Sequence, residues 1–405
     1  MSLPRSLPLA LLAALAAPAA HAEFELGEIG ATSITFEGLL QADYNDYRSD
    51  RADLDSDPGD GRDSDRELRR AELVLKGKGP GGFDWVVGYD AKADKWLDVN
   101  GRLRFGADRA QFLQIGQYKQ PNSLEELSST KQNDFISKAM STNTFGVSRR
   151  LGAAYGIGGD GWTATASWFG RELTDGLAEG SGYGVRGTWA PLRDEGRILH
   201  LGLSYVDFDT PDDRARLRTR PNADLAGVRL VDTGTLSDAD RQSIVGVEAM
   251  WIGGPIKLQG EYLRAGIDRI GTAARPAGDF DGDSWYVSGL WNLGGETWGY
   301  KGGVPTTPKA GGGNRGLWQI GLRYDRVDLD DGRLPPPVPG TAPVVEGVLG
   351  GEMDAWTVGV NWYWRDHVKL ALNYVDVSST RYSSAAGAFV DDDPAIVEAR
   401  VQLHW

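Results

Sequence analysis

Four arginines stand at every second position of one segment, as Arg214, Arg216, Arg218 and Arg220. Alternate side chains of an extended segment point to the same side, so these four would form a single row. Arginine stays protonated and presents a planar fork of N–H donors that fits carboxylate and phosphate oxygens. The spacing therefore predicts a row that could hold a small oxyanion and pass it on. The alternative is a solvated charge run, partly neutralised by Asp212 and Asp213.

The remaining side chains offer little for catalysis or for a bound cofactor. The sequence holds no cysteine, which excludes disulfides, thiolate metal sites and cysteine nucleophiles. Its four histidines are dispersed, and none stands in a recognisable nucleophile motif. Residues 279–283 resemble a calcium loop but lack the glutamate that would complete an EF-hand. We therefore expect no enzyme, no metal and no cofactor, and the formal net charge of −14 argues against nucleic acid as a partner.

The C-terminal segment shows which kind of element would position charged side chains. Apolar residues occupy every second position from Ala395 to Trp405, and polar residues occupy most positions between them. Because side chains alternate sides along a strand, this segment would have one apolar and one polar face. Aromatic residues often end such stripes, as two membrane interfaces require. The pattern recurs about sixteen times, with starts near residues 34, 66, 82, 95, 110, 145, 161, 183, 197, 243, 256, 284, 316, 354, 368 and 394.

The connections between these segments alternate in length. Long ones follow about every second strand, and short ones such as residues 253–255 and 365–367 lie between them. Outer-membrane barrels show this asymmetry, with long external loops and tight periplasmic turns. One connection, residues 294–315, is long where a short turn is due. We predict an all-β fold, a 16-stranded antiparallel transmembrane β-barrel around a water-filled channel. A soluble β-sandwich is the alternative, but strands of ~10 residues are long for it.

Residues 1–22 have the pattern of a secretory signal peptide. Arg5 precedes an apolar run that ends in Ala20-His21-Ala22, a small-x-small cleavage pattern. The run is short of the roughly 20 residues that a spanning helix needs. We expect cleavage after Ala22 and one mature domain, residues 23–405, in the outer membrane of a Gram-negative cell.

Several segments together resemble the phosphate-selective porin O/P family. They are Arg69-Arg70-Ala71-Glu72-Leu73, Gly116-Gln117-Tyr118-Lys119-Gln120-Pro121-Asn122-Ser123-Leu124-Glu125-Glu126, Trp318-Gln319-Ile320-Gly321-Leu322-Arg323-Tyr324 and Gly359-Val360-Asn361-Trp362-Tyr363-Trp364. The second is the most specific, and the resemblance extends over nearly the whole mature chain. It implies a trimeric sixteen-stranded barrel that carries phosphate, pyrophosphate or other anions past lumen-facing Arg and Lys. It also implies an inward-folded constriction loop after the fifth strand and a long periplasmic turn inside the pore, which would account for residues 121–144 and 294–315.

The resemblance assigns the arginine row of residues 214–220 to an external arginine ladder. It assigns Arg69 and Arg70 to the external mouth of the pore. Consecutive residues of a regular strand point to opposite sides, so only one of this pair would enter the lumen.

The resemblance also implies residues for the constriction and the exit. Lys119 would stand at the constriction, with Ser123 as a hydroxyl donor beside it. Lys131 replaces an arginine of the family, which keeps the charge but loses the planar fork. Lys301 and Lys309 would form a basic periplasmic exit.

Acids accompany these bases and leave other functions open. Asp84, Asp90, Asp325 and Glu398 are predicted to face the lumen, where they could line the path or brace the basic residues. A general or sugar-selective diffusion porin is therefore one alternative, and a barrel-borne surface hydrolase or adhesin is another. The partners we expect are small anions, outer-membrane lipid, other copies in a homotrimer, and the barrel-assembly machinery through the strand that ends in Trp405.

Overall fold

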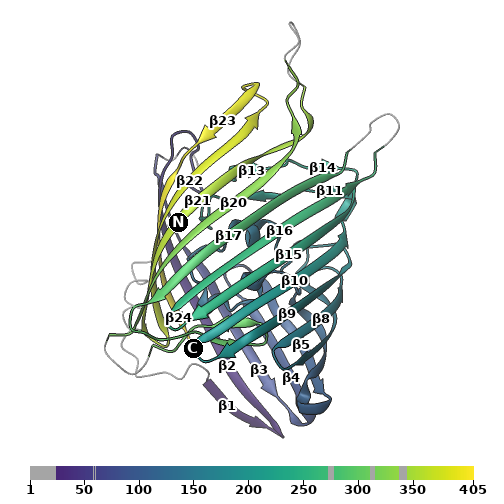
Figure 1. The fold of residues 1–405 in the computed structure, drawn as a ribbon, viewed down its shortest axis with the longest axis vertical. Coiled ribbons are helices and arrows are strands. Elements are labelled where there is room, and N and C mark those ends of the chain that lie inside the picture. Colours follow the sequence, from purple (N-terminus) through teal and green to yellow (C-terminus); the bar gives the residue numbers. More distant parts are fainter. Residues whose placement is uncertain (1–23, 58, 60, 272–277, 311–314, 337–343) are drawn as a thin grey trace.

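Sixteen strands close into one antiparallel barrel (Figure 1). The computed structural model describes residues 24–405 except 58, 60, 272–277, 311–314 and 337–343, so the expected signal peptide and its cleavage after Ala22 lie outside the described residues. The main sheet has eighteen strands, but β1 (Phe24–Ile29) only extends β2 and β23 (Ala388–Asp392) only extends β22 as hairpins. The other sixteen form the barrel wall.

Each wall strand pairs antiparallel with the strand before and after it. The wall strands are β2 (Thr32–Arg48), β3 (Ser64–Lys78), β4 (Phe83–Asp90), β5 (Lys95–Phe105), β6 (Gln111–Lys119), β7 (Arg149–Gly159), β8 (Trp162–Phe169), β9 (Gly182–Asp194), β10 (Arg197–Asp209), β15 (Ala239–Gly253), β16 (Ile256–Arg269), β17 (Phe280–Asn292), β20 (Leu317–Arg333), β21 (Glu346–Arg365), β22 (Val368–Ser383) and β24 (Ala395–His404). β24 pairs with β2 from Leu39 opposite His404 to Arg48 opposite Ala395, which closes the ring. A closed ring leaves no unpaired strand edge in the membrane.

The structure confirms the sixteen predicted strands and their order. Most begin within a few residues of the predicted position. The largest difference is in β21, predicted to begin near residue 354, which begins at Glu346. β20 and β21 continue as one paired hairpin beyond the apolar stripe, because Arg333 still pairs with Glu346. Apolar alternation marks only the lipid-facing part of such a strand.

The apolar stripe changes sides partway along several strands. On β22, Leu370, Leu372 and Tyr374 are exposed on the outer face, whereas Val375 and Val377 are buried on the inner face. The same reversal follows an outward-facing tyrosine on three other strands, at Tyr205, Tyr262 and Tyr324. The tyrosines therefore mark one level of the barrel. Beyond that level the outer face is no longer apolar, and the inner face becomes apolar.

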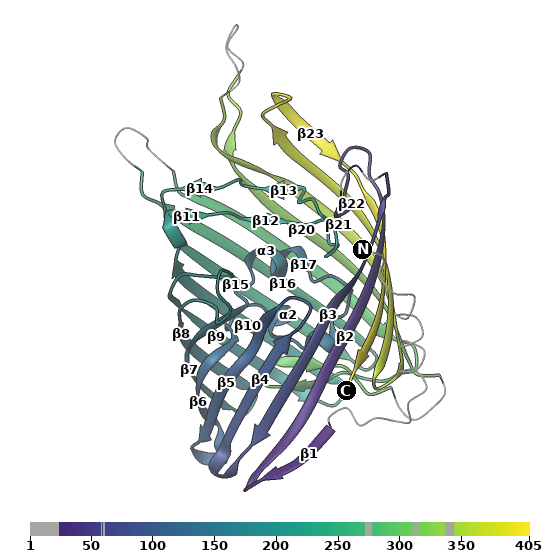
Figure 2. The same cartoon turned by 180° about the vertical axis from the view of Figure 1, so that it is seen from behind.

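Beyond that level the barrel interior holds an apolar core. Inward-facing residues such as Val206 and Val327 pack with loop residues such as Met140, Phe145 and Leu217 in one buried cluster. Figure 2 shows these loops crossing the barrel at its long-loop end. The strand members of the cluster come mainly from β10–β24, so the loops fill that side of the mouth.

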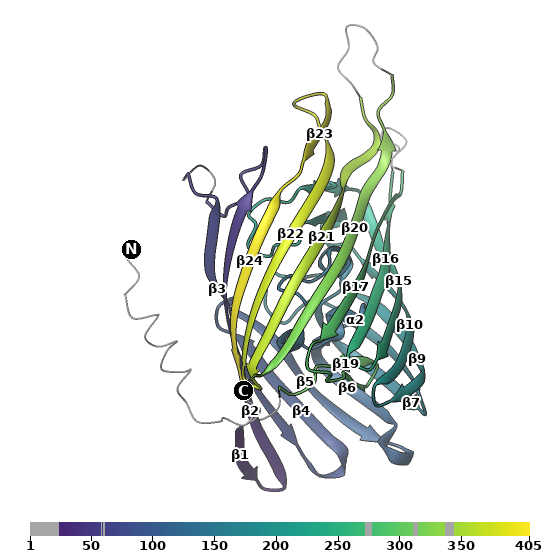
Figure 3. The ribbon, with the colours of Figure 1, turned by 60° about the vertical axis from the view of Figure 1, so that its left-hand side comes forward.

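Two long connections have residues inside the ring of strands. Residues 120–148, after the fifth wall strand, contain α2 (Leu124–Leu127), a 3-10 turn (Thr130–Gln132) and α3 (Met140–Phe145), and the two helices lie inside the ring in Figure 2. The connection from β17 to β20 contains β18 (Gly299–Lys301) and β19 (Val304–Thr306) at the short-turn end of the barrel (Figure 3). Among the described residues no helix is long and apolar enough to cross a membrane.

The connection after β10 carries two small ladders over the mouth. β11 (Arg214–Ala215) pairs with β14 (Leu236–Ser237), and β12 (Arg218–Thr219) pairs with β13 (Val231–Asp232). Three further 3-10 turns lie in connections, at Pro80–Gly82, Ala107–Arg109 and Pro211–Asp213.

Candidate functional site

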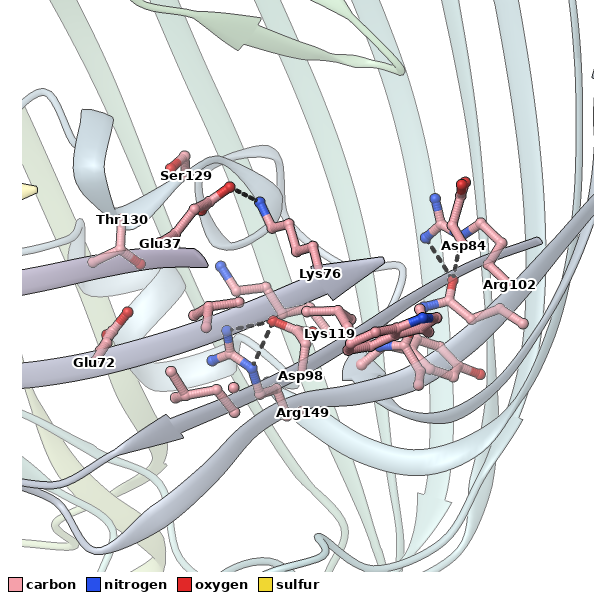
Figure 4. A pocket seen from close by; sticks show the side chains of 18 of the residues that line it. Glu37, Glu72, Lys76, Asp84, Asp98, Arg102, Lys119, Ser129, Thr130 and Arg149 are labelled. Atoms are coloured by element: carbon pink, nitrogen blue, oxygen red, sulfur yellow. Dashed lines mark hydrogen bonds and ion pairs between the residues drawn. The ribbon is translucent and has the colours of Figure 1, made fainter. Parts of the chain in front are cut away.

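A continuous, mainly basic cavity lies along the inner face of β3–β6, opposite the inward loop (Figure 4). Its volume is about 590 Å³. Its described basic lining residues are Lys76, Lys78, Arg102, Arg104, Lys119, Lys131 and Arg149, and its acidic ones are Glu37, Glu72, Asp84 and Asp98. Seven bases against four acids leave three positive charges. A second cavity of about 640 Å³ shares Lys76 and Lys131 with the first and continues to Lys309, so the two form one path toward the short-turn end.

The acids of the cavity brace its bases. Glu37 forms ion pairs with both Lys76 and Lys131, the latter at 3.0 Å. Asp98 pairs with Arg149 at 2.8 Å, and two dashed lines join them in Figure 4. Further along the wall, the carboxylate of Asp84 accepts from the Arg104 side chain at 2.9 Å. Of the acids predicted to face the lumen, Asp84 thus braces a basic residue, and Glu37 and Asp98 do the same.

The inward loop holds Lys119 at the cavity wall. The Lys119 ammonium donates to the carbonyl oxygens of Glu126 and Ser128, the second at 3.3 Å. The Glu126 carboxylate lies 3.8 Å from Lys119 and also pairs with Lys138. Burial would raise the pKa of Glu126, but Lys138, Lys119 and Arg149 outweigh it and hold the pKa well below its ordinary value. Lys119 therefore keeps an ionised partner.

Two other loop residues predicted for the constriction have different surroundings. Lys131 lies where the two cavities meet and donates to the Trp405 carbonyl oxygen at 3.2 Å as well as to Glu37. Ser123 is only 1% exposed, and its hydroxyl accepts from the Glu126 N–H at 3.2 Å as the N-cap of α2. The expected role of Ser123 as a donor to the path has no support in this geometry, because the hydroxyl is buried and its other contact is the Thr142 hydroxyl at 3.3 Å.

Side chains from the opposite wall grip the inward loop. Glu261 on β16 accepts from the backbone N–H groups of Leu124 and Glu125, at 2.7 and 2.8 Å. Arg400 donates to the Ile136 carbonyl oxygen at 2.8 Å, and Lys369 donates to the Asn133 carbonyl oxygen at 2.6 Å. Glu398 and Asp325, two of the predicted lumen acids, bind loop donors at Ser137 and Met140. The loop is thus tied across the barrel rather than suspended from its ends.

The arginine row lies at the mouth with all four residues on one side of an extended segment. Arg214, Arg216 and Arg218 are exposed, and the alternating Ala215, Leu217 and Thr219 are buried against the loop core. Arg216 pairs with Asp232 on the neighbouring strand, with contacts of 2.8 and 2.5 Å. The neutralising acid is therefore Asp232 for this arginine, rather than the adjacent Asp212 or Asp213. Arg220 is partly buried, and its Nε donates to the Ala226 carbonyl oxygen at 2.6 Å.

Both members of the consecutive arginine pair turn inward, which corrects the prediction for a regular strand. Gln41 pairs with Arg70 and Ala42 pairs with Leu68, so Arg69 is an extra, bulged residue on β3. A bulge places two residues opposite one and redirects a side chain. Arg69 lies 3.3 Å from Asp224, a residue of the mouth loop.

Asp224 connects the arginine pair to the arginine row. Burial would raise the pKa of Asp224, but the charges of Arg69, Arg400, Arg70 and Arg220 outweigh it and lower the pKa. Arginines of the mouth loop, of β3 and of β24 therefore act together on one partly buried carboxylate.

The long periplasmic connection is fastened to the inner wall. Arg186 donates to the Gly303 carbonyl oxygen at 2.9 Å, and the Tyr300 hydroxyl lies 2.7 Å from Nδ1 of His200. Of the two predicted exit residues, Lys309 lines the second cavity, whereas Lys301 is exposed and lines neither described cavity.

Sequence reasoning missed much of the basic lining. Arg102, Arg104, Lys76 and Arg149 were not selected, although they line the cavity. A usable signal was present, because Arg102 and Arg104 have the same two-residue spacing as the arginine row, and so do Lys76 and Lys78. Arg149 offered no such signal, since its role depends on Asp98 from another strand.

Comparisons with known proteins agree with this architecture. Residues 35–405 match the model of a family described as phosphate-selective porin O and P. An uncharacterized protein of Caulobacter vibrioides is 28% identical over 368 residues, which cover 85% of this chain and 68% of that protein. Porin O of Pseudomonas aeruginosa is 26% identical over 230 residues, which cover 52% of this chain and 50% of that protein.

Solved structures with the same fold are porins and other outer-membrane proteins. An anion-selective porin from Comamonas acidovorans has a TM-score of 0.53 at 13% identity, with 92% of this chain and 100% of that chain covered. OmpT of Vibrio cholerae, in a trimer form, has a TM-score of 0.53 at 11% identity, with 93% of this chain and 100% of that chain covered. At these identities the likeness concerns the fold alone.

Proposed function

Because the chain belongs to the phosphate-selective porin O and P family and forms an outer-membrane porin channel, we propose that it admits anions, with phosphate or pyrophosphate as cargo. The family and the fold point to a channel rather than an enzyme. We also propose that it assembles as a homotrimer, the form named for the OmpT structure.

The charge balance of the cavity carries this proposal. The first cavity keeps three positive charges after its lining acids are counted, and the two cavities together keep two, from eight bases and six acids, although the whole chain has a formal net charge of −14. A channel responds to the charge that lines it, so the acidic exterior does not oppose an anion path. Conduction requires that each site binds an anion strongly enough to admit it and weakly enough to release it. A series of separate cations meets this requirement, because the anion can pass from one to the next.

The proposed route begins at the arginine row and passes the arginine pair of β3. It then runs past Lys119 and Arg149, which are opposite each other in the β6–β7 pair, and past the Lys76–Glu37–Lys131 group toward Lys309. A sugar-selective porin would need aromatic rings free to stack on a ligand. Tyr286 and Tyr363 face inward, but each is at most 5% exposed, and Tyr286 donates to Glu261 at 2.8 Å. The lining therefore favours an anion over a sugar.

Reversal potentials in a KCl gradient across a planar bilayer test the proposal. We expect anion selectivity, and a chloride current that added phosphate blocks. Lys119→Glu should reverse or strongly reduce the selectivity and weaken the phosphate block by about tenfold or more, because it puts a carboxylate against the loop carbonyls. Lys92→Glu is the matched control, since Lys92 pairs only at 3.5 Å with Glu67 and both side chains are about 40% exposed.

The other outcomes discriminate between the alternatives. Cation selectivity without a phosphate effect would refute the anion proposal and leave a general porin. The absence of any conductance would favour an adhesin or a surface hydrolase, which a hydrolysis assay on the refolded protein would separate.

A further inference from the structure

Arg102 differs from the other arginines of the cavity in having only neutral partners. Its Nε and Nη2 both donate to Oε1 of Gln114, at 3.1 and 2.6 Å. Its guanidinium carbon lies 4.6 Å from the centre of the Phe112 ring. Within the described ranges no carboxylate lies at ion-pair distance from Arg102, whereas Arg104 and Arg149 each have one. The side chain is held in one orientation, and Asp84 and Asp98 attract its charge only at longer range, without a direct ion pair.

The partner of Arg102 is itself fixed by neutral groups. Gln114 is 5% exposed, and its amide Nε2 donates to Oδ1 of Asn100 at 2.9 Å. Asn100 in turn donates to the Gln117 carbonyl oxygen at 2.8 Å. This chain of amides orients the Gln114 oxygen toward Arg102 and ties it to the backbone of β6. It orients the guanidinium through neutral acceptors, which do not cancel its charge.

Arg104 provides a second guanidinium on the same wall. It follows two residues later on β5, so both side chains line the cavity, and of the two only Arg104 forms a direct ion pair with Asp84. Figure 4 shows Arg102 and Asp84 together at one end of the cavity, away from Lys119. The Nη1 group of Arg102 has no partner among the described residues, so it can donate to a ligand.

We propose that Arg102 is a principal anion-binding residue of the cavity, where it takes a small tetrahedral oxyanion with Arg104 as the second donor. This inference rests on the proposed anion function and deepens it. A planar guanidinium matches the oxygens of such an ion, and a fork already oriented by Gln114 loses little entropy when the ion binds. Because Phe112 and Gln114 bring no negative charge, the ion does not have to displace an ion-paired carboxylate from Arg102.

Two nearly isosteric substitutions should move phosphate binding in opposite directions. Gln114→Glu places a carboxylate against Arg102, so the phosphate concentration that halves the chloride current should rise about tenfold. Asp84→Asn removes the partner of Arg104, so the same concentration should fall several-fold. Arg102→Lys keeps the charge and loses the fork, so chloride selectivity should persist while the phosphate block weakens. Inorganic phosphate is the probe in each measurement.

A matched control separates this effect from a general change of charge. Gln111→Glu adds the same charge on the same strand, but Gln111 contacts the exposed Tyr155 at 2.9 Å and should leave the block unchanged. An anion-selective wild type whose block is unaffected by Gln114→Glu and Arg102→Lys would overturn the Arg102 site and leave the anion function standing. A wild type without anion selectivity would overturn the proposed function itself. If Gln114→Glu does not fold, Arg102→Lys and Asp84→Asn decide the question.

Discussion

At the scale of single residues, Glu126 shows how a buried carboxylate maintains the charge of the path. It lies between Lys119 and Lys138, and Arg149 adds to the positive field. The lowered pKa means that the folded barrel binds the Glu126 proton less readily than the unfolded chain does. The resulting stabilisation is complete above the ordinary glutamate pKa of about 4.3, and it is lost as the pH falls from there toward the lowered pKa.

We therefore predict that Glu126→Gln destabilises the barrel at pH 7 but not in strong acid. Removing one partner of a buried ion pair costs about 3–5 kcal/mol, so the variant should unfold at a clearly lower denaturant concentration at neutral pH. The difference should shrink as the pH falls below about 4.3. Unfolding titrations in lipid vesicles at several pH values measure it. Glu67→Gln removes an exposed pair and should cost no more than about 1 kcal/mol. A difference that stays constant down to strong acid would contradict the assigned charge state.

At the scale of elements, the inward loop depends on its anchors across the barrel. The Glu261 carboxylate caps two N–H groups of α2 and accepts from the Tyr286 hydroxyl, while α2 and the residue after it offer carbonyl oxygens to Lys119. Glu261→Ala should leave those N–H groups unpaired and let the loop move. We predict a larger and noisier single-channel conductance with weaker anion selectivity.

A surface glutamate provides the control for this anchor. Glu352 pairs with Arg326 at 2.7 Å with both side chains more than 40% exposed, so Glu352→Gln should not change the conductance. Unaltered noise and selectivity in Glu261→Ala would mean that the other anchors, such as Arg400 and Lys369, are enough to hold the loop.

An element could be predicted from the sequence when a few neighbouring residues determine it. Side-chain alternation depends on a few consecutive residues, so all sixteen wall strands could be found from the sequence. The bulge at Arg69 could not, because it depends on the register between β3 and β2. Ser123 was assigned from its closeness in sequence to Lys119, but the three-residue spacing to Glu126 also fits a helix cap, and that local use is what the structure has.

At the scale of the whole molecule, the sequence pattern described the lipid-facing band better than the interior. The predicted wet inner face holds along the cavity, but toward the mouth the inner face is apolar and packs on loops. The sequence shows this change, because the apolar residues move from the outer-facing to the inner-facing positions after Tyr205, Tyr262, Tyr324 and Tyr374. Recognising it requires knowing that loops return into the barrel, which is a long-range property that no single strand contains.

The same change of phase predicts where the membrane ends on β22. Leu372 is 53% exposed on the outer face below Tyr374, and Ser378 is exposed on the same face beyond it. Arginine on the lipid face near the bilayer midplane of a barrel costs about 2–4 kcal/mol, and near the interface only about 0–1 kcal/mol. Leu372→Arg should therefore destabilise the folded barrel by several times more than Ser378→Arg. Unfolding titrations in lipid vesicles measure both variants, and equal losses would show that Tyr374 does not mark the edge of the apolar band. Both substitutions add the same side chain to the same face of one strand, and the exposed hydrogen bond from Ser378 to Asp393 that Ser378→Arg removes would act against the predicted order, so depth in the membrane has to outweigh it.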